Sequence, residues 1–255
     1  MRPHILLLSA ALLAGTAAHA DQPLTQPVDL ALVLLTDVSK SVDDREYAMV
    51  KEGYQAAFAD PQVIEAILKN SRGVAIAYVE FSGKNEFTVV KGWDVLTDAA
   101  GARVFGEAVA LAPRTSYGST ALAVSLRKAA DMLIVDAAGA SRRVIDVASD
   151  HPNDDGRSGP VRDAAVAAGI TINALPIIEV NRMVPYDGHL TYAVQQWGFE
   201  DAVAFYRNHV IGGPGSFLVE VRDYAAFGEA LKRKLLRELI SSPRGDGSET
   251  FAFAD

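Results

Sequence analysis

The sequence predicts a three-layer α/β fold, in which a mostly parallel central sheet carries helices on both faces. Near-continuous apolar runs have the composition of strands buried on both sides, and helical patterns separate them. Strands that alternate with helices favour a parallel sheet. Residues 86–93 alternate apolar and polar side chains, which indicates one antiparallel edge strand. The predicted core strands are residues 29–36, 73–81, 143–148 and 170–178.

Length and charge describe one acidic globular domain. With 255 residues, of which 49% are hydrophobic, the chain can bury a sizeable core. The formal net charge is −8 and no run of like charges occurs, which argues against nucleic acid or an anionic membrane surface as a partner. We expect one domain at 29–240, between a short leader at 21–28 and a flexible polar tail at 241–255.

The first twenty residues, 1–20, have the pattern of a secretory signal peptide. Arg2 precedes a short apolar stretch and Ala18-His-Ala20 follows it, so cleavage is expected after Ala20. The stretch is too short for a stable membrane helix, and no later segment is long and apolar enough for one. The sequence has no cysteine. We therefore expect a periplasmic or secreted protein without disulfides, and without membrane insertion after cleavage.

In the first half of the chain, each helix is predicted from its apolar spacing and its end signals. The first helix begins at Ser41 with acidic residues in its first turn and ends near Pro61, because the residue before a proline leaves the helical region. Apolar side chains recur along it every three to four positions. The expected helices are residues 41–60, 63–69 and 98–111, followed by a loop at 113–119.

The second half repeats the alternation but is less regular. Leu122, Leu126 and Leu133 share one face of a helix, and Gly169 stops a later one. Residues 179–197 show no clear pattern and are interpreted as a loop and the start of a helix. The remaining expected elements are helices at 120–136, 161–168, 199–209 and 223–240, a polar loop at 151–160, a turn at 212–215 and a last strand at 216–221.

A carboxylate and two hydroxyl groups directly follow the first strand. Alternate residues of an extended segment share a face, so Asp37, Ser39 and Ser41 can converge on one point. That point lies at the carboxyl end of a strand, where open α/β sheets bind ligands. Hard oxygen donors suit Mg²⁺ or Mn²⁺ rather than zinc or copper. The structural alternative makes Ser41 the N-cap of the next helix and Asp37 a turn residue.

Two later segments are expected at the same edge of the sheet. Thr120 follows Gly118-Ser119 at the start of a helix, and Asp150 ends the third core strand. The tips of neighbouring parallel strands, and the loops that follow them, crowd one edge. The predicted metal ligands are therefore Asp37, Ser39, Ser41, Thr120 and Asp150.

These three segments resemble the von Willebrand factor type A (VWA) family with its metal-ion-dependent adhesion site (MIDAS). Asp37-Val-Ser39-Lys-Ser41 matches the family's Asp-x-Ser-x-Ser motif, and the segment 119–126 resembles its threonine segment. Residues 144–150 resemble its strand ending in Thr-Asp-Gly, with His151 in place of the glycine. The resemblance implies a Rossmann-like VWA fold and assigns Thr120 and Asp150 to the metal site. A narrower likeness, to an uncharacterised bacterial subgroup known as a domain of unknown function, rests on the Trp93 region and on residues 145–146, 172–177, 210–215 and 234–239.

The resemblance implies a non-enzymatic binding module. Mg²⁺ prefers six oxygen ligands and readily keeps waters, so few direct carboxylates leave an open position that an acidic group of a protein partner can complete. Two alternatives stay open, a metal-dependent hydrolase or phosphatase and a scaffold with a vestigial site. No Gly-x-Ser-x-Gly elbow, phosphate loop or metal-spaced histidine pair supports an enzyme.

Asp146 is unusual because it lies inside an apolar strand, where a charge is costly unless it is paired. A structural ion pair, for example with an arginine, is the preferred interpretation. The spacing of four from Asp150 places both on one strand face, so a supporting role behind the metal ligands stays open.

Overall fold

The computed structural model describes residues 23–150, 157–178, 183–186, 189–192 and 199–240. The predicted signal peptide at 1–20, most of the loop that includes His151, and the polar tail lie outside the described residues. Within the described residues, no helix is both long and apolar enough to cross a membrane.

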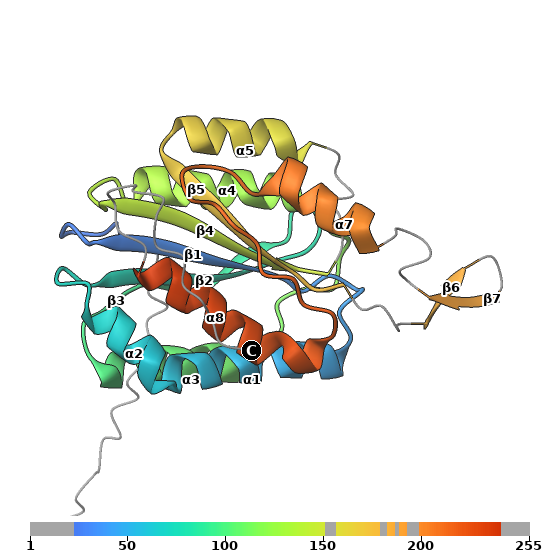
Figure 1. The fold of residues 1–255 in the computed structure, drawn as a ribbon, viewed down its shortest axis with the longest axis horizontal. Coiled ribbons are helices and arrows are strands. Elements are labelled where there is room, and N and C mark those ends of the chain that lie inside the picture. The colour runs from blue at the N-terminus through green and yellow to red at the C-terminus, as the bar shows by residue number, and fades with distance from the viewer. Residues whose placement is uncertain (1–22, 151–156, 179–182, 187–188, 193–198, 241–255) are drawn as a thin grey trace, which may run out of the picture.

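The described strands and helices follow the predicted alternation through most of the chain (Figure 1). The strands are β1 (Leu30–Asp37), β2 (Val74–Phe81), β3 (Phe87–Leu96), β4 (Arg142–Ser149), β5 (Ile170–Pro176), β6 (Met183–Tyr186) and β7 (His189–Tyr192). The helices are α1 (Asp44–Ala59), α2 (Pro61–Leu68), α3 (Ala99–Leu111), α4 (Leu122–Val135), α5 (Ser158–Ala167), α7 (Phe199–Phe205) and α8 (Phe227–Ile240). A single π-helical turn, η1 (Tyr206–Val210), follows α7, and a short 3₁₀ turn, η2 (Tyr224–Ala226), precedes α8.

The central sheet has the strand order β3-β2-β1-β4-β5, which confirms the predicted α/β architecture. β1 pairs in parallel with both β2 and β4, and β5 pairs in parallel with β4. β3 is antiparallel to β2 and forms one edge. After β1 the chain continues to β2, which lies on one side of β1 in the sheet. After β4 it continues to β5, which lies on the opposite side of the sheet. The carboxyl ends of β1 and β4 therefore form the switch point of the sheet, the position at which open α/β sheets bind ligands.

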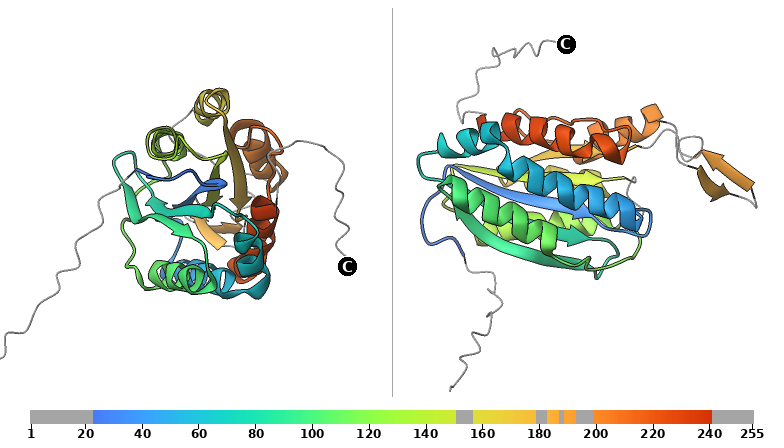
Figure 2. Two further views of the ribbon diagram at one scale, coloured as in Figure 1. Left: turned by 90° about the vertical axis from the view of Figure 1, so that its left-hand side faces the viewer. Right: turned by 90° about the horizontal axis from the view of Figure 1, so that it is seen from below.

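Helices cover both faces of this sheet, and the core is split accordingly (Figure 1). Even-numbered residues of β1, such as Leu32, pack with α1, α2, α3 and α8. Odd-numbered residues, such as Val33, pack with α4, α5 and η1. All eight residues of β1 are buried, as a strand with helices on both sides requires. Figure 2 shows the same two helical layers from other directions.

Local predictions were wrong at several points. Residues 216–221 form no continuous strand, because they join the β5 edge only through isolated bridges at Leu218 and Val221. Residues 183–192 contain the antiparallel pair β6–β7, where we expected a loop and a helix start. Finally, α1 begins at Asp44 rather than Ser41, since Asp43 is its N-cap.

Candidate metal centre

β1 delivers Asp37 to the carboxyl edge of the sheet, at the switch point beside β4. Asp37 is the last residue of β1, and Ser39 and Ser41 follow in the β1–α1 loop, which spans residues 38–43. Thr120 lies in the α3–α4 loop, residues 112–121, and Asp150 directly follows β4. Asp37, Ser39 and Thr120 are each less than 5% exposed, so the cluster is set into the edge rather than laid on the surface.

The structure brings together all five predicted site residues. The Thr120 hydroxyl donates to Ser39 Oγ at 3.1 Å, and Ser41 Oγ donates to Asp150 Oδ1 at 2.8 Å. The Ser39 and Ser41 hydroxyls are 3.0 Å apart, and Ser39 is the donor if Ser41 gives its proton to Asp150. Asp37 joins through its Oδ1, which accepts from the Ser39 amide at 2.8 Å. Residues from three distant segments thus share one hydrogen-bonded cluster.

Two supporting residues were missed by the sequence analysis. Ser149 Oγ donates to Asp37 Oδ2 at 2.6 Å, so that both carboxylate oxygens of Asp37 are held. Behind it, Tyr206 Oη donates to the Ser149 carbonyl at 3.2 Å. Tyr206 is fully buried and belongs to the π-helical turn η1. Ser149 could have been noticed as the hydroxyl residue preceding Asp150, but nothing in the sequence indicates Tyr206.

The electrostatics of the cluster favour a bound cation. Burial first, and then the nearby Asp150 carboxylate, raise the pKa of Asp37 to about 7. Hydrogen bonds from Ser149 and Ser39 act in the opposite direction. Two carboxyl groups that oppose each other's ionisation are a place where a positive charge is stabilising.

The donor set also fits a hard divalent cation. It consists of two carboxylates and three hydroxyls, with no sulfur or imidazole, and such oxygen donors suit Mg²⁺ or Mn²⁺. Among the described residues, no group of three or more His, Cys, Asp or Glu side chains is placed to hold a metal. A site at Asp37 would therefore depend on hydroxyl groups as well as its two acids. The assignment of these five residues as metal ligands stays a prediction.

The structural alternative for Ser41 is wrong. The N-cap of α1 is Asp43, whose side chain accepts from the Glu46 amide at 2.8 Å, while Glu46 Oε2 accepts from the Asp43 amide. This reciprocal capping box satisfies the start of the helix without Ser41. The Ser41 hydroxyl is instead directed to Ser39 and Asp150.

Asp146 belongs to a separate cluster on the opposite face of the sheet. It forms an ion pair with Lys234 of α8, not with an arginine, and Lys234 also contacts Glu238 at 2.6 Å. Asn173 donates to the same Glu238 oxygen at 2.9 Å. We call Asp146, Lys234, Glu238 and Asn173 the buried ionic cluster. It confirms the interpretation of Asp146 as a structural ion pair, with a different partner from the one suggested.

Comparison with models of known protein families assigns the chain to a family. A family model described as "Protein of unknown function (DUF1194)" matches residues 27–243. The chain belongs to the DUF1194 family. No match was found among curated proteins.

Solved structures similar to this DUF1194 chain show the fold. The pilus adhesin SpaC from Lactobacillus rhamnosus GG, in its open conformation, has a TM-score of 0.55 and 17% identity over 86% of this chain and 31% of its own. Proximal thread matrix protein 1 from the mussel byssus, with a zinc-occupied MIDAS motif, has a TM-score of 0.52 and 14% identity over 81% and 46%. An aerotolerance-related membrane protein from Bacteroides fragilis has a TM-score of 0.51 and 14% identity over 81% and 98%.

These likenesses show a VWA-like fold, and the matching family is described as a protein of unknown function. The DUF1194 chain spans about a third of the adhesin and about half of the byssus protein. Sequence identities below 20% are evidence for a shared fold and are not evidence for a shared activity.

Proposed function

We propose that this DUF1194 chain is an exported, non-enzymatic binding module that holds Mg²⁺ or Mn²⁺ and uses it to capture an acidic group of a protein partner. The observation that carries the proposal is the convergence of Asp37, Ser39, Ser41, Thr120 and Asp150 on one hydrogen-bonded cluster. The VWA-like fold adds support, because one protein with the same fold has a zinc-occupied MIDAS.

Each residue of the cluster has a distinct part in this proposal. Ser39, Ser41 and Thr120 offer neutral hydroxyl oxygens, so they add ligands without cancelling the charge of the cation. Asp37 is oriented through both its oxygens, by Ser149 and by the Ser39 amide. When bound, the cation would supply a positive centre with an open position that a partner's carboxylate can complete.

Export is part of the same proposal and rests on residues 1–20. Proteins with a similar fold include a pilus adhesin and a membrane protein, and an adhesin acts by binding. A surface or periplasmic location would expose the cluster to divalent cations and to other exported proteins.

The first experiment is calorimetric titration of residues 21–255 with Mg²⁺ and with Mn²⁺, beside the variant Asp37→Ala. We expect about one equivalent to bind to the wild type and none to the variant, because both carboxylate oxygens of Asp37 are oriented within the cluster. Circular dichroism should show the same fold for both. Asp131→Ala, which removes one exposed aspartate from α4, is the matched control and should bind like the wild type.

A second arm tests carboxylate capture with acetate as the probe. In the presence of Mg²⁺, acetate should shift the amide resonances of Ser39 and Lys40, and without Mg²⁺ it should not. Equal Mg²⁺ binding by wild type and Asp37→Ala would show that the site is assigned wrongly. Mg²⁺-dependent turnover of a generic phosphate ester, lost in Asp37→Ala, would replace the binding module with the hydrolase alternative.

A further inference from the structure

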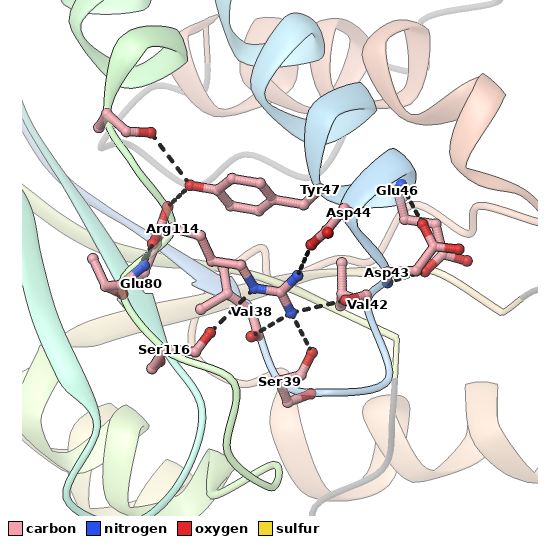
Figure 3. Close-up of polar contacts among 12 residues, drawn as sticks. Val38, Ser39, Val42, Asp43, Asp44, Glu46, Tyr47, Glu80, Arg114 and Ser116 are labelled. Atoms are coloured by element: carbon pink, nitrogen blue, oxygen red, sulfur yellow. Dashed lines mark hydrogen bonds and ion pairs between the residues drawn. The ribbon is translucent and has the colours of Figure 1, made fainter.

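Arg114 contacts the loop that carries two of the site hydroxyls, although it lies outside the predicted ligand set. It comes from the α3–α4 loop, the same loop that carries Thr120. Its side chain is only 5% exposed and points into the β1–α1 loop (Figure 3). An arginine buried to this degree requires partners for its donors, and their identity indicates what the side chain does.

The partners are backbone carbonyls of the β1–α1 loop. Arg114 Nη2 donates to the carbonyls of Val38 at 2.9 Å, Ser39 at 2.8 Å and Val42 at 2.8 Å. These three carbonyls span the turn between β1 and α1, and the planar guanidinium fixes their direction. Because the Ser39 and Ser41 side chains project from this turn, Arg114 determines the backbone from which both hydroxyls are presented.

The guanidinium is itself held in place from its own loop. Its Nε donates to the Ser116 carbonyl at 3.1 Å, and the Tyr117 ring stacks on it with 3.9 Å between ring centroid and Cζ. The neighbouring Thr115 donates through its amide and its hydroxyl to Glu80 Oε2, at 3.0 and 2.9 Å. Glu80 is fully buried in β2. The α3–α4 loop is thus anchored to the sheet at Thr115 and contacts the β1–α1 loop through Arg114.

A second link runs between the same two loops. The Lys40 amide donates to the Gly118 carbonyl at 2.9 Å, so Lys40 connects the serine loop to the segment just before Thr120. This amide reports on the relative position of the two loops, and it lies outside the ligand set.

We propose that Arg114 is a positioning residue that holds the β1–α1 loop against the α3–α4 loop, so that Ser39 and Ser41 face Thr120 before a cation arrives. The contacts above support the statement that Arg114 holds the β1–α1 loop. The effect of Arg114 on cation affinity rests on the proposed function. A methionine at position 114 would fill similar space but leave three carbonyls without their donor. A lysine keeps the charge and loses the fork geometry and the Ser116 contact.

The test compares Arg114→Met and Arg114→Lys with the wild type and with Arg142→Met. Arg142 is the matched control, since it donates to the Glu238 carbonyl from the start of β4, at the opposite end of the sheet. Amide hydrogen exchange is measured by NMR on the metal-free protein. We expect the Lys40 amide to exchange at least tenfold faster in Arg114→Met, with an intermediate effect in Arg114→Lys and no change in Arg142→Met.

Mg²⁺ affinity is then measured on the same proteins. We expect a loss of about 10- to 100-fold in Arg114→Met, as for residues that orient metal ligands, with partial rescue by lysine and wild-type affinity in Arg142→Met. Wild-type exchange at Lys40 in Arg114→Met overturns the proposal, as does unchanged affinity once the loop is loosened. If Arg114→Met does not fold, Arg114→Lys decides by the same criteria. If the wild type binds no Mg²⁺, the proposed function fails, whereas the exchange data still decide whether Arg114 holds the loop.

Discussion

The two faces of the central sheet each bury an aspartate, and the two sites are built in opposite ways. Asp37, on the face that packs against α4 and α5, is surrounded by hydroxyl and amide donors. Asp146, on the face that packs against α1 and α8, is paired with a buried lysine. Burial raises the pKa of each carboxyl to about 7, aided by Asp150 in the first case and by Glu238 in the second.

The difference separates a structural site from one suited to binding. In the buried ionic cluster a cation is already supplied by the chain, since Lys234 is 0% exposed and contacts both acids. At the switch point, the contacts that the described residues make with Asp37 and Asp150 include neutral hydroxyl and amide donors, at a partly exposed edge. We infer that removing charge should cost stability on the α8 face and binding at the switch point.

The largest expected effect is on the α8 face. Lys234→Met leaves Asp146 and Glu238 buried without the ammonium group that contacts both, and breaking a buried pair in this way costs about 3–5 kcal/mol. Lys232→Met is the matched control on the same helix, because its ion pair with Asp60 is partly exposed and contributes about 0–1 kcal/mol. Urea unfolding of the metal-free proteins measures both. Equal decreases in the free energy of unfolding for Lys234→Met and Lys232→Met would contradict the proposed difference between a buried and a surface lysine.

The second prediction concerns pH and Asp146. A carboxyl whose pKa is raised in the folded state stabilises the protein fully below its unfolded pKa of about 3.9, and this contribution is lost as pH rises through about 7. Asp146→Asn mimics the protonated acid and removes this dependence. The free energy of unfolding of Asp146→Asn minus that of the wild type should therefore increase as the pH rises from 5 to 8. The increase should be at most about 1.4 kcal/mol per pH unit.

Urea unfolding at several pH values checks the sign of this effect. All other groups, Asp37 included, titrate in both proteins and largely cancel in the difference. A difference that is flat or falls with rising pH would show that Asp146 is ionised across the whole range.

The smallest stability effect is expected for two single hydroxyls, one at the switch point and one on the α1 side of β1. Thr120→Val should lower the free energy of unfolding by about 1 kcal/mol, the contribution of one hydrogen bond, and weaken Mg²⁺ binding about tenfold. Thr36→Val is the matched control. Its hydroxyl is also buried and contacts Tyr54 Oη at 2.8 Å, on the α1 side of the strand that ends in Asp37. It should cost similar stability and leave Mg²⁺ affinity unchanged, as calorimetry would show.

Much of the fold could be predicted because its signals are local. The continuous apolar run of β1 and the alternation in β3 identify a buried strand and an edge strand. The five site residues could be predicted to lie close together because the carboxyl ends of parallel strands meet at one edge of the sheet. That rule needs only the order and direction of the strands. The start of α1 was missed by three residues, since both Ser41 and Asp43 have the chemistry of an N-cap.

The missed features depend on contacts between distant residues. Asp146 is 88 positions from Lys234, and only the packing of α8 on β4 decides that a lysine rather than an arginine is its partner. Arg114 lies in a loop with no periodic pattern, and its role appears only when three carbonyls of another loop surround it. Residues 216–221 carry strand-like composition, but they join β5 only through isolated bridges.

The hydroxyl chain at the switch point has a direction. Thr120 donates to Ser39, and Ser41 donates to Asp150, so in the metal-free protein the hydroxyl protons run toward one carboxylate. A cation bound as proposed would need the lone pairs of these oxygens, so its binding would turn the hydroxyls about their Cβ–O bonds. Such a rotation moves no backbone atom. The hydroxyls therefore satisfy one another in the metal-free protein, and binding of the proposed cation would require no rebuilding of the loop.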